Sequence, residues 1–109
     1  MPDPGSETPG EPIIALIEWQ APSLGPAEAR RLGVDTVAAL GRVPGLLEVR
    51  VFGDFETGRH FYFQRWESQA ALDAFMASDS MTRNREIAAP FVSGRPTRVI
   101  YADYSPPPS

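Results

Sequence analysis

The chain has 109 residues, of which 42% are hydrophobic, and this is enough for one domain with a core of its own. Its formal net charge of −4 and its lack of lysine argue against nucleic acid as a partner, because phosphate binding needs a basic face. The absence of cysteine excludes a disulfide framework, a thiolate metal site and a cysteine nucleophile, and it fits a cytoplasmic protein.

Both ends of the chain are rich in proline and poor in apolar residues. Residues 1–12, MPDPGSETPGEP, predict a disordered leader, and residues 105–109 predict an extended tail. The folded domain is therefore expected at residues 13–104. The acidic leader does not resemble a signal peptide and no apolar run reaches membrane-spanning length, so we expect no membrane partner.

Residues 13–20, IIALIEWQ, alternate in the manner of a strand that is covered on both faces. The breaker run APSLGP follows, and Pro26 suits a first helical turn because its missing N–H costs nothing there. Apolar residues at helical spacing then predict a helix from Ala27 to about Val43. The sequence VPG at residues 43–45 ends it.

Residues 46–55, LLEVRVFGDF, predict a second strand, and residues 56–58 predict a tight turn. Residues 59–66, RHFYFQRW, are then the returning strand of a hairpin. Period-two geometry gives this third strand one face that combines rings with hydrogen-bonding groups. Its members are His60, Tyr62, Gln64 and Trp66.

Ser68 is a predicted N-cap for the next helix, whose buried edge consists of Leu72, Phe75 and Met76. The sequence SDS at residues 78–80 breaks this helix and starts a second short one, which ends before a proline. Residues 96–104, PTRVIYADY, predict the last strand, and the proline is expected only at its start.

The order of these elements predicts an α+β fold of the ferredoxin-like kind. Two split β-α-β units would form a four-stranded antiparallel sheet with the helices on one face. Every strand carries apolar residues on both sides, so the face without helices is expected to be apolar as well. An uncovered apolar face marks an interaction surface, and we expect two copies of the chain to bury it in a homodimer.

Residues 13–104 resemble the antibiotic biosynthesis monooxygenase family, which belongs to the dimeric α/β-barrel superfamily. The likeness is carried by the element order, by VPG before the second strand, and by WESQAALDAF from the third strand into the next helix. Within the family it is closest to the small quinone-forming monooxygenases of aromatic polyketide pathways. The superfamily also holds polyketide cyclases, heme-degrading enzymes and proteins without known activity, so the fold alone does not define a reaction.

The resemblance implies an enzyme without flavin, heme or metal, in which a deprotonated phenol or anthrone reduces O2 itself. Trp66 matches the family's tryptophan at the end of the third strand. The family's asparagine four residues earlier is Tyr62 here, and its tyrosine on the following helix is Leu72. Its arginine in the second short helix corresponds to Arg85 or Arg83.

The heme-degrading branch of the superfamily needs an iron-binding histidine on the helix after the third strand. This helix offers only Phe75 and Met76 at that place, so we expect no heme.

The predicted catalytic residues are therefore Trp66 as a cavity wall, with Tyr62 and Arg85 orienting a substrate anion. Gln64, His60 and the helix residues Leu72, Phe75 and Met76 are predicted to bind the substrate. Each has a structural alternative, because the aromatic residues can be ordinary core and an arginine in TRNRE can belong to a solvated helix face.

Two side chains could supply a proton-transfer group. His60 is the only histidine and has a suitable unperturbed pKa, although its place two residues after a turn favours exposure. Glu18 would have a raised pKa and serve as a base if it were buried, and it would be an ordinary surface carboxylate otherwise.

Two classes of function follow. The first is a cofactor-independent monooxygenase that oxidises a small polycyclic phenol or anthrone to a quinone with O2 as co-substrate, or a cyclase or isomerase in the same pocket. The second is a non-catalytic ligand-binding dimer that has lost the site, which the replacements at Tyr62 and Leu72 favour. No nucleotide loop, metal-ligand spacing, triad or paired carboxylate occurs in the sequence, so an enzyme here depends on pocket shape and polar placement.

Overall fold

The computed structural model describes residues 11–106. In chain order its elements are β1 (Ile13–Gln20), α2 (Pro26–Leu40), β2 (Leu46–Asp54), β3 (Arg59–Trp66), α3 (Gln69–Met76), α4 (Asp79–Ala88) and β4 (Ser93–Ala102). The predicted leader and tail fall mostly on residues 1–10 and 107–109, which lie outside the described residues.

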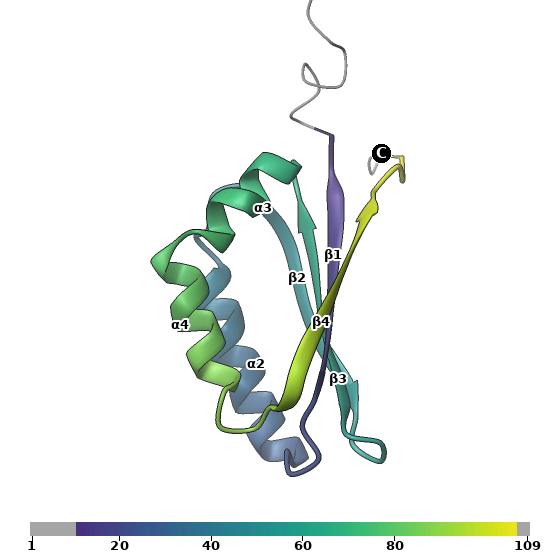
Figure 1. Cartoon of the computed structure of the whole chain (residues 1–109), viewed down its shortest axis with the longest axis vertical. Helices are drawn as coiled ribbons and strands as arrows, with labels where there is room; N and C mark the ends of the chain where they lie inside the picture. Colours follow the sequence, from purple (N-terminus) through teal and green to yellow (C-terminus); the bar gives the residue numbers. More distant parts are fainter. Residues whose placement is uncertain (1–10, 107–109) are drawn as a thin grey trace, which may run out of the picture.

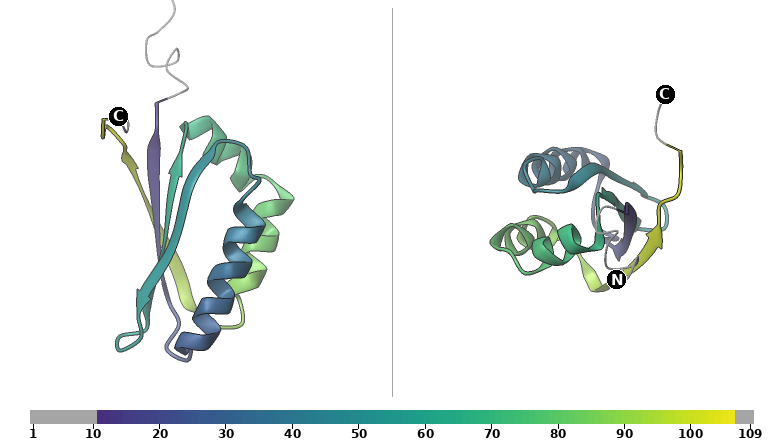
Figure 2. Two further views of the ribbon diagram at one scale, coloured as in Figure 1. Left: turned by 180° about the vertical axis from the view of Figure 1, so that it is seen from behind. Right: turned by 90° about the horizontal axis from the view of Figure 1, so that it is seen from above.

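The four strands form one antiparallel sheet in the order β2-β3-β1-β4, so that β1 and β3 occupy its centre. All three helices lie on one face of this sheet (Figure 1). The views from behind and from above show that no helix crosses the opposite face (Figure 2). This arrangement confirms the ferredoxin-like α+β fold that the sequence predicts.

Each helix begins at a residue suited to its first turn. Pro26 opens α2. The hydroxyl of Ser68 accepts a hydrogen bond from the N–H of Ala71 at 3.1 Å, which confirms this predicted cap of α3. The hydroxyl of Ser78 accepts from the N–H of Met81 at 3.4 Å and caps α4 in the same way. Such caps contribute about 1 kcal/mol each.

The turn before β2 holds α3 in place over the sheet. Gly45 has φ +83°, a conformation that side chains disfavour, and a Cβ at this position would overlap the Cβ of Ala71 in α3. The carbonyl of Gly45 also accepts a hydrogen bond from the N–H of Glu67 at 2.8 Å. The VPG turn therefore packs directly on the junction between β3 and α3.

Two boundaries differ from the sequence-based prediction. Helix α2 ends at Leu40 rather than near Val43, because Gly41 follows and the chain turns there. Strand β4 begins at Ser93, so Pro96 lies inside the strand and not at its start. A proline is tolerated there because β4 is an edge strand, and its register with β1 shifts in this segment.

The side chains between the sheet and the helices form two clusters. One surrounds Trp19 and Tyr62, and the other surrounds Trp66, Leu72 and Phe75. Helix α4 packs against α2 and α3 rather than over β4. Every residue of β4 is consequently exposed, and the space between β4 and α4 is open.

The helix-free face of the sheet carries apolar side chains on all four strands, but Glu18, Glu48, Arg50 and Arg65 lie among them, so it is less uniformly apolar than the sequence predicts. The register places seven apolar side chains on it: Ile14, Leu16, Phe52, Phe61, Phe63, Val99 and Tyr101. Phe52 and Phe61 stack at a ring separation of 5.1 Å. Phe52, Val99 and Tyr101 are about half exposed.

Candidate functional site

The four side chains that the sequence places on one face of β3 all point toward the helices. His60, Tyr62, Gln64 and Trp66 are buried, and the residues between them are less so. The register sets them opposite residues of β1 that point the same way: Trp19 faces His60, and Ile17 faces Tyr62. The central strands thus carry a row of rings and polar groups beneath the helices.

A cavity of about 820 Å³ lies between this row and the helices α3 and α4, and it opens beside β4. A space of this size suits a small-molecule ligand. Its walls are mainly apolar: Ile17, Trp19, Phe75, Met76, Met81, Ala88, Ala89, Val92 and Pro96. Its polar residues are Tyr62, Gln64, Asn84, Thr97, Arg85, Arg95 and Arg98. Five of the predicted site residues therefore meet here, namely Tyr62, Gln64, Phe75, Met76 and Arg85.

Trp66 does not line this cavity, although the family resemblance assigns it a wall. Its side chain is fully buried and packs on Phe75 at a ring separation of 5.3 Å. Its indole Nε1–H donates a hydrogen bond to Gln64 Oε1 at 3.1 Å. Leu72 is buried in the same cluster and also lies outside the cavity lining. Trp66 therefore reaches the cavity only through its neighbours Gln64 and Phe75.

Tyr62 supplies an unpartnered hydroxyl in a buried position. Burial raises the pKa of Tyr62, and a weak interaction with the Thr36 hydroxyl of α2 opposes that change in part. Neither hydroxyl has a hydrogen-bond partner at full hydrogen-bond geometry. Tyr62 is thus a protonated phenol at a cavity wall, with Thr36 beside its hydroxyl. The ring of Tyr62 packs on Trp19 at 5.5 Å, and the indole N–H of Trp19 is likewise buried without a partner.

Asn84 is a cavity residue that the sequence did not reveal. It projects from α4, it is buried, and its Oδ1 has no hydrogen-bond partner. Buried polar atoms are rarely left unpaired in native proteins, so an unpaired amide oxygen at a cavity wall indicates a place for a ligand or water. The run TRNRE carries no signal that singles out this asparagine from its exposed neighbours.

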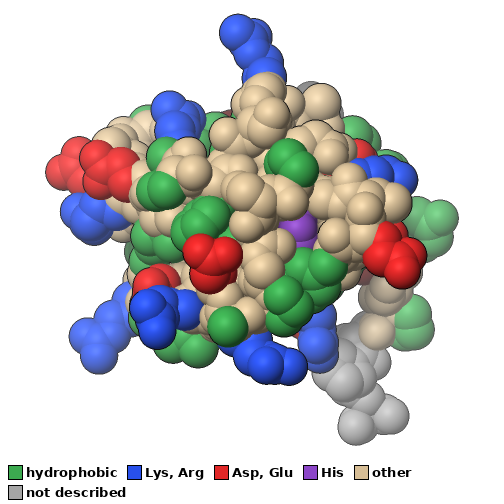
Figure 3. Space-filling model, turned by 90° about the horizontal axis from the view of Figure 1, so that it is seen from below, with side chains coloured by type: hydrophobic (Ala, Val, Ile, Leu, Met, Phe, Trp, Pro, Cys, Tyr) green, Lys and Arg blue, Asp and Glu red, His purple; other side chains and the backbone are tan. Residues whose placement is uncertain are grey.

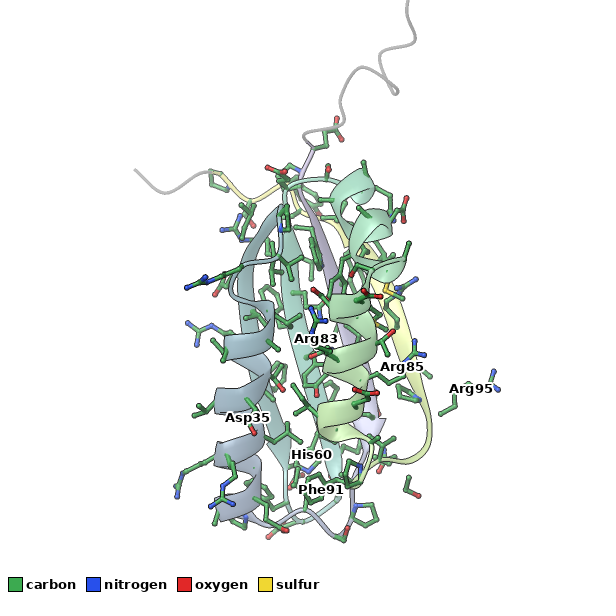
Figure 4. The ribbon with its side chains drawn as sticks, turned by 90° about the vertical axis from the view of Figure 1, so that its left-hand side faces the viewer. Asp35, His60, Arg83, Arg85, Phe91 and Arg95 are labelled. Carbon is green, nitrogen blue, oxygen red and sulfur yellow. The ribbon has the colours of Figure 1, made fainter. Side chains whose placement is uncertain are left out.

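The two candidate arginines of α4 point in different directions. Arg85 lines the cavity, and Figure 4 shows it on the side of α4 nearer β4. Arg83 lies on the side nearer α2, and its guanidinium donates a hydrogen bond to Ser80 Oγ at 3.2 Å. Of the two arginines, Arg85 is the one that lines the cavity.

His60 lies in a second, smaller cavity rather than with Tyr62. This space of about 370 Å³ lies between α2 and the hairpin of β2 and β3, and Trp19 separates it from the larger one. The imidazole is buried because Gly53, its partner on β2, leaves room for it, and a Cβ at that glycine would overlap the ring. Figure 3 shows the histidine at the bottom of a hollow. The expectation that His60 is exposed is therefore wrong.

Burial lowers the pKa of His60, and the nearby carboxylate of Asp54 opposes this in part. Its Nε2 has no hydrogen-bond partner. The rings of Trp19 and Phe55 pack on it at 5.3 and 5.4 Å. His60 is therefore a neutral, enclosed side chain at pH 7.

Glu18 lies on the helix-free face of the sheet, away from both cavities. Its carboxylate forms an ion pair with Arg59 at 2.8 Å, and the hydrogen bond from Arg59 lowers the pKa of Glu18. The alternative in which Glu18 is a buried base does not hold.

Among residues 11–106 there is no group of three or more metal-ligating side chains close enough to hold a metal ion. Over the same part of the chain no helix is long and apolar enough to cross a membrane. The larger cavity is lined by no carboxylate and no histidine. What it offers a ligand is apolar walls, neutral donors and acceptors, and positive charge.

Solved structures of the antibiotic biosynthesis monooxygenase family have the same fold, which confirms the resemblance at that level. A proposed antibiotic biosynthesis monooxygenase from Caulobacter crescentus CB15 is 17% identical, with a TM-score of 0.72 over 92% of this chain and 96% of that one. SnoaB from Streptomyces nogalater, a cofactor-independent oxygenase, is 12% identical, with a TM-score of 0.71 over 91% of this chain and 99% of its own. Rv0793 from Mycobacterium tuberculosis is 15% identical, with a TM-score of 0.68 over 87% of this chain and 97% of that one.

No protein-family model matches the sequence, and neither does any curated protein. At these identities the likeness establishes the fold, and the chemistry has to be argued from the cavity.

Proposed function

We propose that this protein is a cofactor-independent monooxygenase that oxidises a polycyclic phenol or anthrone to a quinone in the larger cavity. The observation that carries the proposal is the meeting of Tyr62, Gln64 and Arg85 at an apolar cavity that holds no acidic side chain. Such a site stabilises an organic anion, and an electron-rich aromatic anion reacts with O2 directly. The cofactor-independent oxygenase SnoaB shares the fold and lends further support.

The reaction needs no external reductant. For an anthrone, C14H10O + O2 gives C14H8O2 + H2O, so the ring CH2 becomes a carbonyl and supplies all four electrons. A ring C–H proton passes first to a water molecule or hydroxide at the open side of the cavity, because the lining holds no carboxylate or histidine, and the resulting anion forms a carbon–oxygen bond with O2. Loss of water from the peroxide then yields the quinone. The protein has to bind the substrate, favour its anion and exclude bulk water.

Three groups favour the anion. The Tyr62 hydroxyl, kept protonated by its raised pKa, donates to the substrate oxygen. Gln64 accepts from Trp66 through Oε1, so its NH2 group is the part left for the substrate. The guanidinium of Arg85 adds positive charge, which lowers the pKa of a bound phenol.

Asn84 and the apolar walls position the rings. The unpartnered Oδ1 of Asn84 accepts from a substrate hydroxyl. Phe75, Met76 and Met81 cover the ring faces and limit the access of water to the reacting carbon. These walls also strengthen each polar contact by lowering the local dielectric constant.

The alternatives differ from the monooxygenase in what they require of the cavity. The lining supplies no histidine or carboxylate, so a cyclase or isomerase would have to pass protons to water just as the monooxygenase does, and its independence of O2 is what distinguishes it. A purely structural protein that has lost its site would have Tyr62 and Trp66 packed together over a filled core. Instead Tyr62 packs on Trp19, Trp66 packs on Phe75, and a cavity lies beside them.

The test is O2 consumption with 1,8-dihydroxyanthrone, followed together with quinone absorbance. We expect one O2 per quinone at a rate well above that of the buffer and of heat-denatured protein. Turnover that continues without air would contradict the oxygenase and favour the isomerase.

The homodimer is part of the same proposal. The apolar, helix-free face of the sheet has no cover in a single chain, and a second copy offers an identical apolar surface. Pairing of the two faces would give a dimeric barrel and leave each cavity on the outside, between its own sheet and helices.

A further inference from the structure

The smaller cavity, between α2 and the hairpin of β2 and β3, has no part in the proposed reaction, yet it encloses an unpaired polar group. His60 lies at its floor (Figure 3). The side chain is only 3% exposed, and its Nε2 has no hydrogen-bond partner. Because buried nitrogens are rarely left unpaired in native proteins, this atom indicates a place for a ligand or water.

A glycine in α2 keeps the space above His60 open. Gly33 lies one helical turn after Ala29, and both residues line the cavity. Its φ is not positive, and a Cβ at this position would meet no atom within 4 Å. Glycine weakens a helix relative to alanine because it loses more backbone freedom on folding. Neither backbone conformation nor crowding requires a glycine here, so what Gly33 contributes is room in the cavity.

The walls of this cavity are apolar and rich in aromatic rings. Trp19 and Phe55 pack on the imidazole at ring separations of 5.3 and 5.4 Å. The other apolar walls are Leu24, Pro26, Ala29, Leu32, Val51 and Phe52. An apolar cavity of about 150 Å³ is enough to hold benzene. The volume here is about 370 Å³, which gives room for one or two fused rings.

The charges around the cavity favour an uncharged ligand. Burial lowers the pKa of His60 although the carboxylate of Asp54 is nearby, so the imidazole is neutral at pH 7. An anion beside His60 would be repelled by Asp54. A cation would pass Arg30, the charged residue of the lining, which is exposed at the opening. Burial of either charge without a partner would be costly as well.

The neutral imidazole also defines the polar group that the ligand needs. One of its nitrogens donates a hydrogen bond and the other accepts one, depending on the tautomer. A hydroxyl both donates and accepts, so it can pair with Nε2 of His60 in either tautomer. The unpaired nitrogen and the surrounding rings are therefore satisfied together by a hydroxyl on an aromatic ring.

We propose that the smaller cavity binds an uncharged aromatic alcohol of one or two rings, whose hydroxyl pairs with His60 Nε2 and whose ring lies against Trp19 and Phe55. Trp19 separates this site from the cavity of the proposed reaction. The inference therefore holds whether or not the protein is an oxygenase.

The experiment is an NMR titration of the intact protein with 2-naphthol, observed at the imidazole. His60 is the only histidine of the chain, so its proton and nitrogen signals report on this cavity without ambiguity. We expect saturable shifts, with the largest nitrogen shift at Nε2. The comparison ligand 2-methylnaphthalene has nearly the same size but no hydroxyl, and it should bind about tenfold more weakly.

Two variants assign the binding to one cavity. Gly33→Leu fills the smaller cavity, and it should fold because its Cβ has room and leucine favours a helix. It should weaken the binding of 2-naphthol seen at His60 by about tenfold or more. Ala89→Leu is the matched control, since it adds a leucine to the larger cavity, and it should keep the affinity within about twofold.

His60 signals that do not move up to the solubility limit of 2-naphthol would overturn the inference and leave the cavity to water. Equal affinities for 2-naphthol and 2-methylnaphthalene would refute the pairing with Nε2. Tighter binding of 2-naphthoate or of 2-naphthylmethylammonium would refute an uncharged ligand. Binding that survives in Gly33→Leu and is lost in Ala89→Leu would belong to the larger cavity and contradict the proposal.

Discussion

The indole N–H of Trp66 donates to Gln64 Oε1 at 3.1 Å, and this contact determines which end of the Gln64 amide is available to the cavity. Trp66 itself is fully buried and lies outside the cavity lining. In the proposed function it is therefore a positioning residue that acts through Gln64. The two residues lie two apart on β3, so one strand would supply both the proposed donor to the ligand and the group that orients it.

Trp66→Phe should lower kcat/KM about tenfold, because the Gln64 amide is then free to turn its oxygen toward the substrate anion. It should also lower the free energy of unfolding by about 1–3 kcal/mol through lost packing and the lost hydrogen bond. A double-mutant cycle separates the two effects. In a Gln64→Leu background the change at Trp66 should no longer affect kcat/KM, while its effect on unfolding persists. An equal loss of kcat/KM in both backgrounds would refute the positioning role.

Tyr62→Phe should lower kcat by about 10², the usual effect of losing one donor to a developing anion. The free energy of unfolding should stay the same or rise by up to about 1 kcal/mol, because the deleted hydroxyl is buried without a partner. Enzyme kinetics and a urea titration measure the two quantities. Tyr104→Phe is the matched control, since it removes a tyrosine hydroxyl from an exposed residue that does not line the cavity. If Tyr104→Phe reduced kcat as much as Tyr62→Phe, direct donation by Tyr62 would be untenable.

The pH dependence of stability should carry a contribution from His60. Burial lowers its folded-state pKa below the ordinary value of 6.5, so the unfolded chain binds a proton more readily than the folded one. The folded state should therefore lose stability as pH falls below about 6.5 toward the lowered value, and no such loss should occur above it. Urea titrations between pH 7.5 and 5.5 on the wild type and His60→Phe measure this difference. An NMR titration midpoint for His60 at or above 6.5 would contradict it.

The same histidine should have little effect on the reaction. His60 lies in the smaller cavity, on the other side of Trp19 from Tyr62. His60→Asn should keep kcat/KM within about twofold, and the pH profile should follow ionisation of the substrate alone. A profile with an additional enzyme group near pH 6–7 that disappears in His60→Asn would show that the histidine takes part.

Val99→Arg should convert a dimer into a monomer, because it puts a charge in the apolar, helix-free face of the sheet. Light scattering should give twice the chain mass of 11.9 kDa for the wild type and the single mass for the variant. Val34→Arg is the control on the exposed surface of α2 and should remain dimeric. A monomeric wild type at micromolar concentration would be inconsistent with pairing of the sheet faces.

The fold could be predicted from the sequence because its signals are local. Alternation in residues 59–66 put His60, Tyr62, Gln64 and Trp66 on one face, and all four are buried there. Ser68 was recognisable as a cap from its place before an amphipathic segment. Such patterns need only the geometry of one element at a time.

The extent of the cavity and the rest of its lining could not be predicted, because they depend on contacts between elements distant in sequence. The cavity is open because α4 packs on α2 and leaves β4 uncovered. No local sequence pattern predicts on which element α4 packs. His60 is buried because a glycine, Gly53, is its partner on the neighbouring strand, which requires the exact hairpin register. Asn84 sits in a polar run whose burial only the packed helices reveal.

The most direct test of the account is simultaneous recording of O2 and quinone with 1,8-dihydroxyanthrone, for the wild type and Tyr62→Phe. The account predicts one O2 consumed per quinone formed, acceleration over the spontaneous reaction, and loss of most of that acceleration in Tyr62→Phe. Quinone formation no faster than in buffer, or unchanged by Tyr62→Phe, would contradict it.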